Sequence, residues 1–113
     1  MKKFYILLLC FVLLLLSWSL NSQIVINEID AANDRVELKN TGTTTVNVSS
    51  YWLCDRPQYD QIGGLGVFCG NANLGPGDIL VVNTGSINIS GNDGEMGLYL
   101  NSSFGSSNSI IDI

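Results

Sequence analysis

The sequence predicts an all-β domain that follows an N-terminal export signal. Two observations favour β structure: short runs rich in β-branched and aromatic residues recur along the chain, and clusters of Gly, Asn, Asp and Ser separate them. A third observation argues against a helical bundle, because no apolar pattern repeats at helical spacing after the first 22 residues. Together these features predict a β-sandwich or barrel.

Residues 1–22 have the layout of a secretory signal peptide. Lys2 and Lys3 precede an apolar run over residues 4–16, and a small polar stretch, SWSLNS, follows it. This run is shorter than the roughly 20 residues that cross a bilayer as a helix. We therefore expect a signal-peptide helix that is cleaved after Ser22. Retention as an N-terminal membrane anchor is the minor alternative.

Residues 23–113 are acidic and fit one small domain. They keep three basic residues, Arg35, Lys39 and Arg56, against all ten acidic ones, which gives a net charge of −7. Such a charge opposes binding to nucleic acid or anionic lipid, where clustered Lys and Arg are expected. We therefore expect a secreted or cell-surface protein with no nucleic-acid partner and no membrane insertion after signal cleavage.

Eight strands are predicted in this domain. The first two, IVINEI and RVELKN, alternate apolar and polar residues as half-buried strands do, and the later ones are short β-rich runs bounded by turn residues. In chain order the predicted strands are 24–29, 35–40, 45–48, 51–54, 66–69, 78–83, 95–100 and 109–113.

The breaks between these strands contain recognisable turn residues. LGPG at 74–77 places Pro76 and Gly77 at the central positions of a type II turn, where glycine tolerates the positive φ. GNDG at 91–94 predicts a hairpin. The longer break at 55–65, DRPQYDQIGGL, predicts an exposed loop that presents Tyr59 for recognition.

Cys54 and Cys69 remain after signal removal, in a chain that is sent to an oxidising compartment. A disulfide between them is the expected state, and closing a loop of about 15 residues would stabilise the fold by roughly 3 kcal/mol. The alternative is a reactive thiol or metal pair. It is disfavoured because CxxC spacing is absent and the sequence has no histidine.

The segment INEIDAANDRVELKNTG at 26–42 places a glutamate in each of two neighbouring strands. A hairpin with the turn AAND would pair Asp30 with Arg35, Glu28 with Glu37 and Ile26 with Lys39. The predicted core face then consists of Val25, Ile29, Val36 and Leu38. Because like charges directly opposite each other are destabilising, the two glutamates need solvent, nearby cations or a metal.

Three interpretations of the glutamate pair remain open. One is a calcium or magnesium site made from Glu28, Asp30, Asp34 and Glu37, since hard cations prefer carboxylate oxygens. Another is a glycosidase-like carboxylate pair. The favoured one is a solvated charged face that discourages edge pairing, because Arg35 and Lys39 offset the repulsion. Without histidine, a Ser-His-Asp triad cannot form, and we expect no catalytic residues, no bound metal and no cofactor.

Six stretches of the domain together resemble the lamin tail domain, in the form found in secreted bacterial proteins. They occur in family order and are INEID (26–30), VELKNTG (36–42), VNVSSYWL (46–53), LGPGDILVV (74–82), GEMGLYL (94–100) and IIDI (110–113). Ser50 stands where the family has glycine. The resemblance implies an immunoglobulin-like β-sandwich over residues 23–113 that is truncated at its last strand, because the family continues past the position of Ile113.

The resemblance implies a function only in outline. Bacterial members are commonly accessory domains of secreted hydrolases or surface proteins, so we expect a secreted, non-catalytic interaction or adhesion module. Its expected partner is an extracellular or cell-surface protein or polysaccharide. The alternative is a targeting or substrate-binding domain of a longer secreted hydrolase, such as a nuclease or phosphoesterase.

Overall fold

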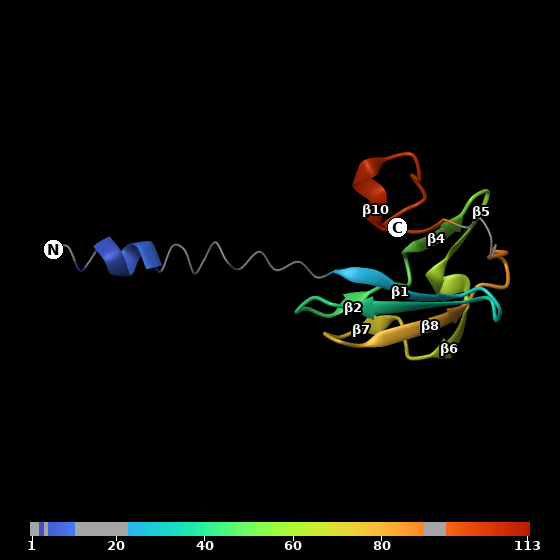
Figure 1. Cartoon of the computed structure of the whole chain (residues 1–113), viewed down its shortest axis with the longest axis horizontal. Coiled ribbons are helices and arrows are strands. Elements are labelled where there is room, and N and C mark those ends of the chain that lie inside the picture. Colours follow the sequence, from blue (N-terminus) through green and yellow to red (C-terminus); the bar gives the residue numbers. More distant parts are fainter. Residues whose placement is uncertain (1–2, 4, 11–22, 90–94) are drawn as a thin grey trace.

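The computed structural model describes residues 3, 5–10, 23–89 and 95–113, and within them the predicted all-β domain is confirmed (Figure 1). Two short 3₁₀ helices, η1 (Ile62–Gly64) and η2 (Ser107–Ser109), accompany the strands. The strands are β1 (Ile24–Asp30), β2 (Arg35–Asn40), β3 (Val46–Asn47), β4 (Trp52–Asp55), β5 (Gln58–Gln61), β6 (Gly66–Cys69), β7 (Asn73–Leu74), β8 (Ile79–Asn83), β9 (Met96–Tyr99) and β10 (Ile110–Asp112).

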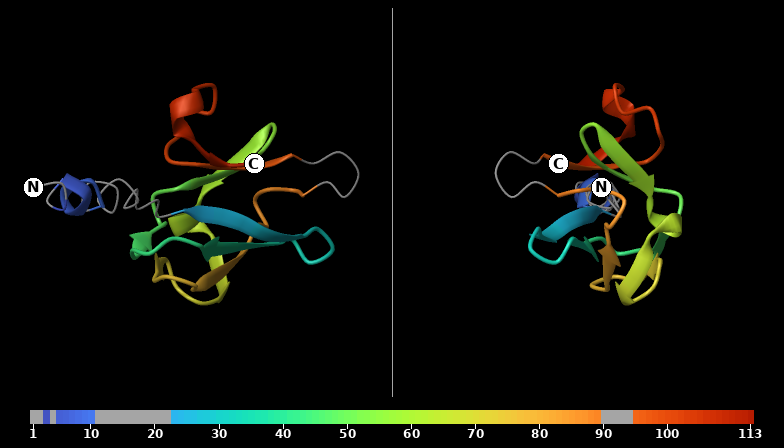
Figure 2. Two further views of the ribbon diagram at one scale, coloured as in Figure 1. Left: turned by 60° about the vertical axis from the view of Figure 1, so that its left-hand side comes forward. Right: turned by 90° about the vertical axis from the view of Figure 1, so that its right-hand side faces the viewer.

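The strands form antiparallel sheets arranged in layers (Figure 2). The first sheet has the order β1-β2-β8-β6, and the second has the order β10-β9-β4-β5. A small third sheet pairs β3 with β7. β2 and β8 are central in the first sheet, β4 and β9 are central in the second, and all four strands contribute buried side chains to the core.

One hydrophobic core is shared by the two larger sheets. Val36 and Leu38 of β2 face Val82 and Leu80 of β8, and all four side chains are fully buried. Leu53 and Leu98 contribute from the second sheet. Burying a side chain of this size stabilises a fold by about 1.5–3 kcal/mol. Among the described residues, the buried cluster spans Ile24 to Leu98, and the partly buried Ile111 packs against it.

The predicted register of the first hairpin is correct near its turn and wrong further from it. Glu28 pairs with Glu37 and Asp30 with Arg35, but Ile26 pairs with Leu38 instead of Lys39. The cause is a β-bulge between Ile26 and Glu28, which inserts one extra residue and reverses the alternation of the strand.

Because of this bulge, the predicted core face is wrong for part of β1. Val36 and Leu38 are buried as expected, whereas Val25 pairs with Lys39 on the outer side of the sheet. Ile24 is buried in its place. Ile29 faces Val36 but remains 44% exposed, because β1 is an edge strand.

The predicted exposed loop at 55–65 is largely a hairpin. β5 pairs with β4 from Trp52 opposite Gln61 to Asp55 opposite Gln58, and η1 follows it. The run QYDQ has little intrinsic strand preference beyond its tyrosine, so its pairing with β4 decides the conformation. Tyr59 is 55% exposed, in agreement with its predicted accessibility.

The turn predicted at 74–77 is confirmed. Gly77 has a φ of 81°, and the Asp78 amide donates to the Gly75 carbonyl at 3.0 Å, as in a type II turn. In the turn before Tyr51, the Tyr51 amide donates to the Val48 carbonyl at 3.0 Å. The turn therefore forms with Ser50 at the position where the resemblance predicts glycine. The hairpin predicted at 91–94 lies outside the described residues.

Asn40, at the end of β2, is fully buried and fully hydrogen-bonded. Its side-chain amide donates to the carbonyls of Thr44 and Leu74 at 2.7 and 2.8 Å, and its side-chain oxygen accepts from the Gly42 amide at 2.9 Å. Its own amide donates to the Asp78 carbonyl at 3.0 Å. One side chain therefore joins β2, the loop that follows it and β7.

The N-terminal segment is helical over residues 5–10, where every described side chain is exposed. The expected cleavage position after Ser22 lies outside the described residues. Among the residues that are described, no helix is long and apolar enough to cross a membrane.

The predicted disulfide between Cys54 and Cys69 is not formed, and both residues are free cysteines. Cys54 alternates with the core residue Leu53 in β4, so its side chain lies on the outer side of the second sheet. Cys69 is exposed in β6, at the edge of the first sheet. Their closeness in sequence did not place them together, because the two strands belong to different layers.

The Cys54 thiol is buried, whereas the Cys69 thiol is exposed. Burial raises the pKa of the Cys54 thiol; nearby Arg56 lowers that pKa and Asp55 raises it further. The thiol is therefore protonated at neutral pH and is a weak nucleophile.

We expect Asn40→Ala to lower the free energy of unfolding by about 3 kcal/mol, because it leaves buried carbonyl and amide groups without partners. Urea unfolding followed by circular dichroism measures this change. Thr41→Ala is the control, since it removes only an exposed hydrogen bond to the Gln23 carbonyl and should change stability by less than about 1 kcal/mol. Equal losses in both variants would contradict the role given to Asn40.

We expect alkylation of the purified protein, without reductant, to label Cys69 rapidly and Cys54 slowly, because only the former is exposed. Labelling of Cys54 should accelerate only at a pH above the usual thiol range, since burial raises its pKa. Peptide mapping by mass spectrometry distinguishes the two sites. Protection of both thiols until a reductant is added would show a disulfide and contradict this assignment.

Candidate functional site

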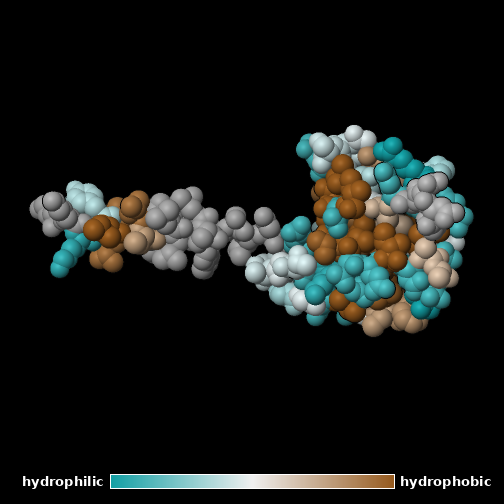
Figure 3. Space-filling model, viewed as in Figure 1, coloured by the Kyte–Doolittle hydropathy of each residue, from teal (hydrophilic) through white to brown (hydrophobic). Residues whose placement is uncertain are grey.

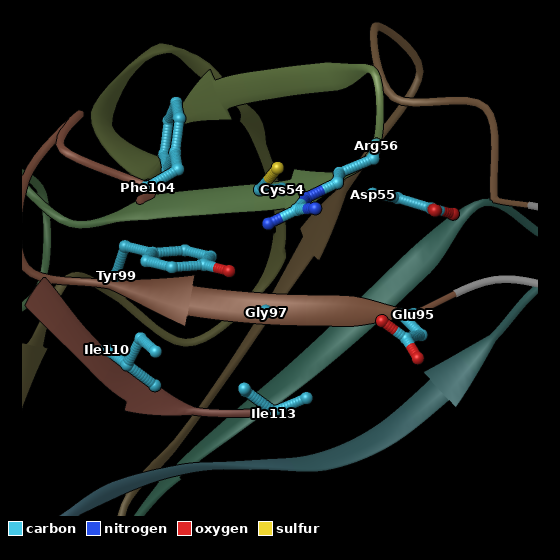
Figure 4. Close-up of a pocket in the computed structure, with 9 residues that line it drawn as sticks. All are labelled: Cys54, Asp55, Arg56, Glu95, Gly97, Tyr99, Phe104, Ile110 and Ile113. Carbon is cyan, nitrogen blue, oxygen red and sulfur yellow. The ribbon is translucent and has the colours of Figure 1, made fainter. Parts of the chain in front are cut away.

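A cavity of about 320 Å³ opens beside β4 and β9 and is drawn in Figure 4. Cys54, Gly97 and Tyr99 alternate with the core residues Leu53 and Leu98, so they place the cavity on the outer side of the second sheet. The lining residues are Cys54, Asp55, Arg56, Glu95, Gly97, Tyr99, Phe104, Ile110 and Ile113.

Gly97 and Tyr99 form the floor of this cavity. Gly97 pairs with Cys54 in the neighbouring strand, and the Tyr99 ring lies over it. A Cβ atom at position 97 would come within 2.5 Å of the Tyr99 ring. A glycine is therefore needed at this position for the ring to lie along β9, where it gives the cavity a flat aromatic surface.

Phe104 forms an aromatic wall and comes from the segment between β9 and β10. Its ring centroid lies 5.0 Å from those of Tyr99 and Tyr59 and 6.1 Å from that of Trp52. Trp52 and Tyr59 are themselves 6.0 Å apart. We call Trp52, Tyr59, Tyr99 and Phe104 the aromatic cluster. It extends from the buried Tyr99 to the exposed Tyr59 over the outer side of the second sheet.

Asp55 borders the cavity, but the alternation of β4 places its side chain on the side of Leu53, opposite to that of Cys54. It is only 7% exposed, and its Oδ2 atom has no hydrogen-bond partner in the described part of the chain. A buried polar atom without a partner costs about 1–3 kcal/mol, and more when it is charged. Because this atom has almost no accessible surface, a ligand in the cavity cannot supply the missing hydrogen bond.

Two further charged residues flank the cavity. Arg56 and Glu95 are both exposed. In Figure 4 the Arg56 guanidinium is directed toward the side of Tyr99 and Phe104, whereas the carboxylates of Asp55 and Glu95 lie on the opposite side. The Arg56 guanidinium therefore lies on the side of the aromatic rings, and the exposed Glu95 carboxylate lies at the other end of the cavity.

The predicted carboxylate pair lies elsewhere, on the outer side of the first sheet. Glu28, Asp30 and Glu37 line a shallow depression of about 150 Å³. Asn27, the bulge residue, donates from its side-chain amide to Glu37 at 2.6 Å and so offsets the repulsion between the two glutamates. Arg35 lines the same depression, with its guanidinium 3.6 Å from the centroid of the Phe68 ring.

Three of the four calcium candidates line this depression, and the fourth, Asp34, does not. Asp30 accepts from the amide and the side chain of Asn33 at 3.2 and 2.8 Å, which closes the hairpin turn. Asp34 occupies that turn with a φ of 51° and does not line the depression. Across the described residues, no group of three or more His, Cys, Asp or Glu side chains is placed to hold a metal ion.

A third surface is apolar. On the face shown in Figure 3, hydrophobic side chains gather between β1 and the C-terminal segment. Ile26, Ile29, Met96 and Ile113 line a depression there. The polar residues Asn27 and Glu28 also line this depression.

Sequence reasoning missed the residues of the cavity. They come from segments that are distant in sequence, near Asp55, at Glu95 to Gly97 and at Phe104, and no local motif connects these segments. The sequence predicts an exposed loop at Asp55 and therefore does not indicate that Asp55 pairs with Met96 of β9. Only the alternation of YWLCD could have indicated that Trp52 and Cys54 share one side of a strand.

No protein-family model, curated protein or solved structure matches the chain. The interpretation of the site therefore rests on its own chemistry. That chemistry comprises an exposed guanidinium and an exposed carboxylate, from Arg56 and Glu95, and an aromatic cluster that reaches the surface.

Proposed function

We propose that the chain is a secreted, non-catalytic interaction module with an immunoglobulin-like β-sandwich of the lamin tail type. The strand order supports the fold: β1-β2-β8-β6 corresponds to the A-B-E-D sheet of immunoglobulin domains, and β10-β9-β4-β5 corresponds to G-F-C-C′. The lysine-initiated apolar run before the domain supports export.

The aromatic cluster beside the cavity is the observation that supports this function best. Ligand sites are typically concave and largely apolar, with a few polar groups that fix orientation. Aromatic residues are also enriched where proteins recognise partners. Here the partly exposed rings adjoin a cavity that is flanked by the exposed Arg56 guanidinium and the exposed Glu95 carboxylate, which is a composition suited to recognition.

The chemistry of the lining favours binding over catalysis. Burial raises the pKa of the Cys54 thiol, so the one thiol of the cavity is protonated and a weak nucleophile. A partner outside the cell is consistent with the acidic domain and its export signal, and an extracellular protein or a polysaccharide would suit this surface. The same surface would serve an accessory domain of a secreted hydrolase.

Cosedimentation with intact cells of the producing organism tests this function. We expect the exported protein to bind the cell surface, and Tyr59→Ala to weaken binding at least tenfold because it removes an exposed ring of the aromatic cluster. Phe68→Ala is the matched control, since Phe68 is exposed to a similar degree (56%) on the first sheet. Binding no greater than that of an unrelated acidic protein, or equal losses in both variants, would refute the function.

A further inference from the structure

We propose that the cavity binds an extended peptide segment of a partner protein and encloses one apolar side chain of that segment. An acidic side chain of the segment would bind Arg56, and a basic side chain would bind Glu95. This inference rests on the proposed function and specifies the chemical class of its ligand.

Arg56 and Glu95 are the charged groups of the cavity that a ligand can reach. Both side chains are exposed, and neither forms a hydrogen bond or an ion pair within the described part of the chain. The Arg56 guanidinium is close enough to Cys54 to lower the pKa of that thiol, so its charge acts inside the cavity. A ligand in the cavity therefore meets one positive group and one negative group.

These two charged groups point apart although their backbones are neighbours. Asp55 pairs with Met96, so Arg56 and Glu95 lie at adjoining ends of β4 and β9. In Figure 4 the guanidinium extends toward the aromatic rings, and the Glu95 carboxylate lies at the other end of the cavity. Because like charges repel, Glu95 opposes a simple anion and Arg56 opposes a simple cation. A segment with one acidic and one basic side chain complements both groups.

The rest of the reachable lining is largely apolar. Tyr99 and Phe104 provide aromatic surface, and Ile110 and Ile113 are 40% and 71% exposed at the edge of the cavity. The volume of about 320 Å³ lies at the small end of the range for ligand pockets, so it suits one large side chain. The partner therefore has to present this side chain on a segment that can enter the cavity.

The residue composition favours a protein partner over a saccharide. Trp, Tyr and Arg are enriched among the side chains that contribute most to binding in protein interfaces. Trp52, Tyr59 and Arg56 provide all three types around this cavity, and Tyr59 is 55% exposed, so the segment can continue over its ring. A neutral sugar would displace water from both charged groups without offering an opposite charge to either.

The arrangement of the lining also specifies an order of side chains in the segment. Along the cavity in Figure 4, the aromatic rings come first, the Arg56 guanidinium next and the Glu95 carboxylate last. Alternate side chains of an extended chain point to the same side. The expected segment therefore carries an apolar, an acidic and a basic residue at every second position.

Calorimetric titration of the exported protein tests this order. The probes are Phe-Gly-Asp-Gly-Lys, its charge-exchanged counterpart Phe-Gly-Lys-Gly-Asp, both with capped termini, and a tetrasaccharide of β-1,4-linked glucose. We expect saturable binding of the first peptide, at least tenfold weaker binding of the second and no binding of the saccharide. High salt should weaken binding of the first peptide, because it screens both ion pairs.

Variants of the two charged residues locate the binding site. Arg56→Gln should weaken the first peptide about fivefold, which is the effect of one exposed ion pair, and Arg35→Gln on the first sheet is the matched control. The double variant Arg56→Glu with Glu95→Arg keeps the net charge and should prefer the second peptide. Amide chemical-shift changes on titration should centre on Gly97 and Tyr99, which form the cavity floor.

Distinct outcomes would overturn the inference. Equal binding of the two peptides, or an unchanged preference in the double variant, would show that Arg56 and Glu95 do not recognise the charges of the segment. Binding of the tetrasaccharide alone would assign the cavity to a polysaccharide. No binding of any probe, while the protein still binds cells, would refute the peptide and leave the proposed function standing.

Discussion

The buried amide of Asn40 is the constraint on which the arrangement of the first sheet depends. It joins the end of β2 to the carbonyls of Thr44 and Leu74, and the backbone of Asn40 is bonded to the turn that precedes β8. These bonds hold β2 and β8 in the register that pairs Leu38 with Leu80 and Val36 with Val82. The Asn40 amide can be buried because its hydrogen bonds are made within the fold, and it helps to hold the strands that carry the core side chains.

Asp55 is the opposite case within the same fold. Its carboxylate is as inaccessible as many core side chains, but its Oδ2 atom has no partner in the described residues. Two buried polar side chains thus have different consequences: that of Asn40 specifies the strand arrangement, whereas that of Asp55 decreases stability.

The bulge at Asn27 explains how an acidic surface is tolerated on the first sheet. It directs an amide toward Glu37 across from Glu28, and Arg35 lies over Phe68 in the same depression. The charges on this side are thus balanced by neighbours within the sheet. On the second sheet, the buried Oδ2 atom of Asp55 has no such partner among the described residues.

Local sequence determined the features whose physical causes are local. Alternation specified β1 and β2, and the Pro76-Gly77 pair specified the turn before β8 because only glycine readily adopts its φ. Tertiary structure decided the rest. β5 exists because β4 offers a pairing partner, Cys54 and Cys69 are separated because their strands belong to different sheets, and the cavity forms because Phe104 folds back onto Tyr99. These outcomes depend on contacts between distant segments, whose free energy no local pattern of residues encodes.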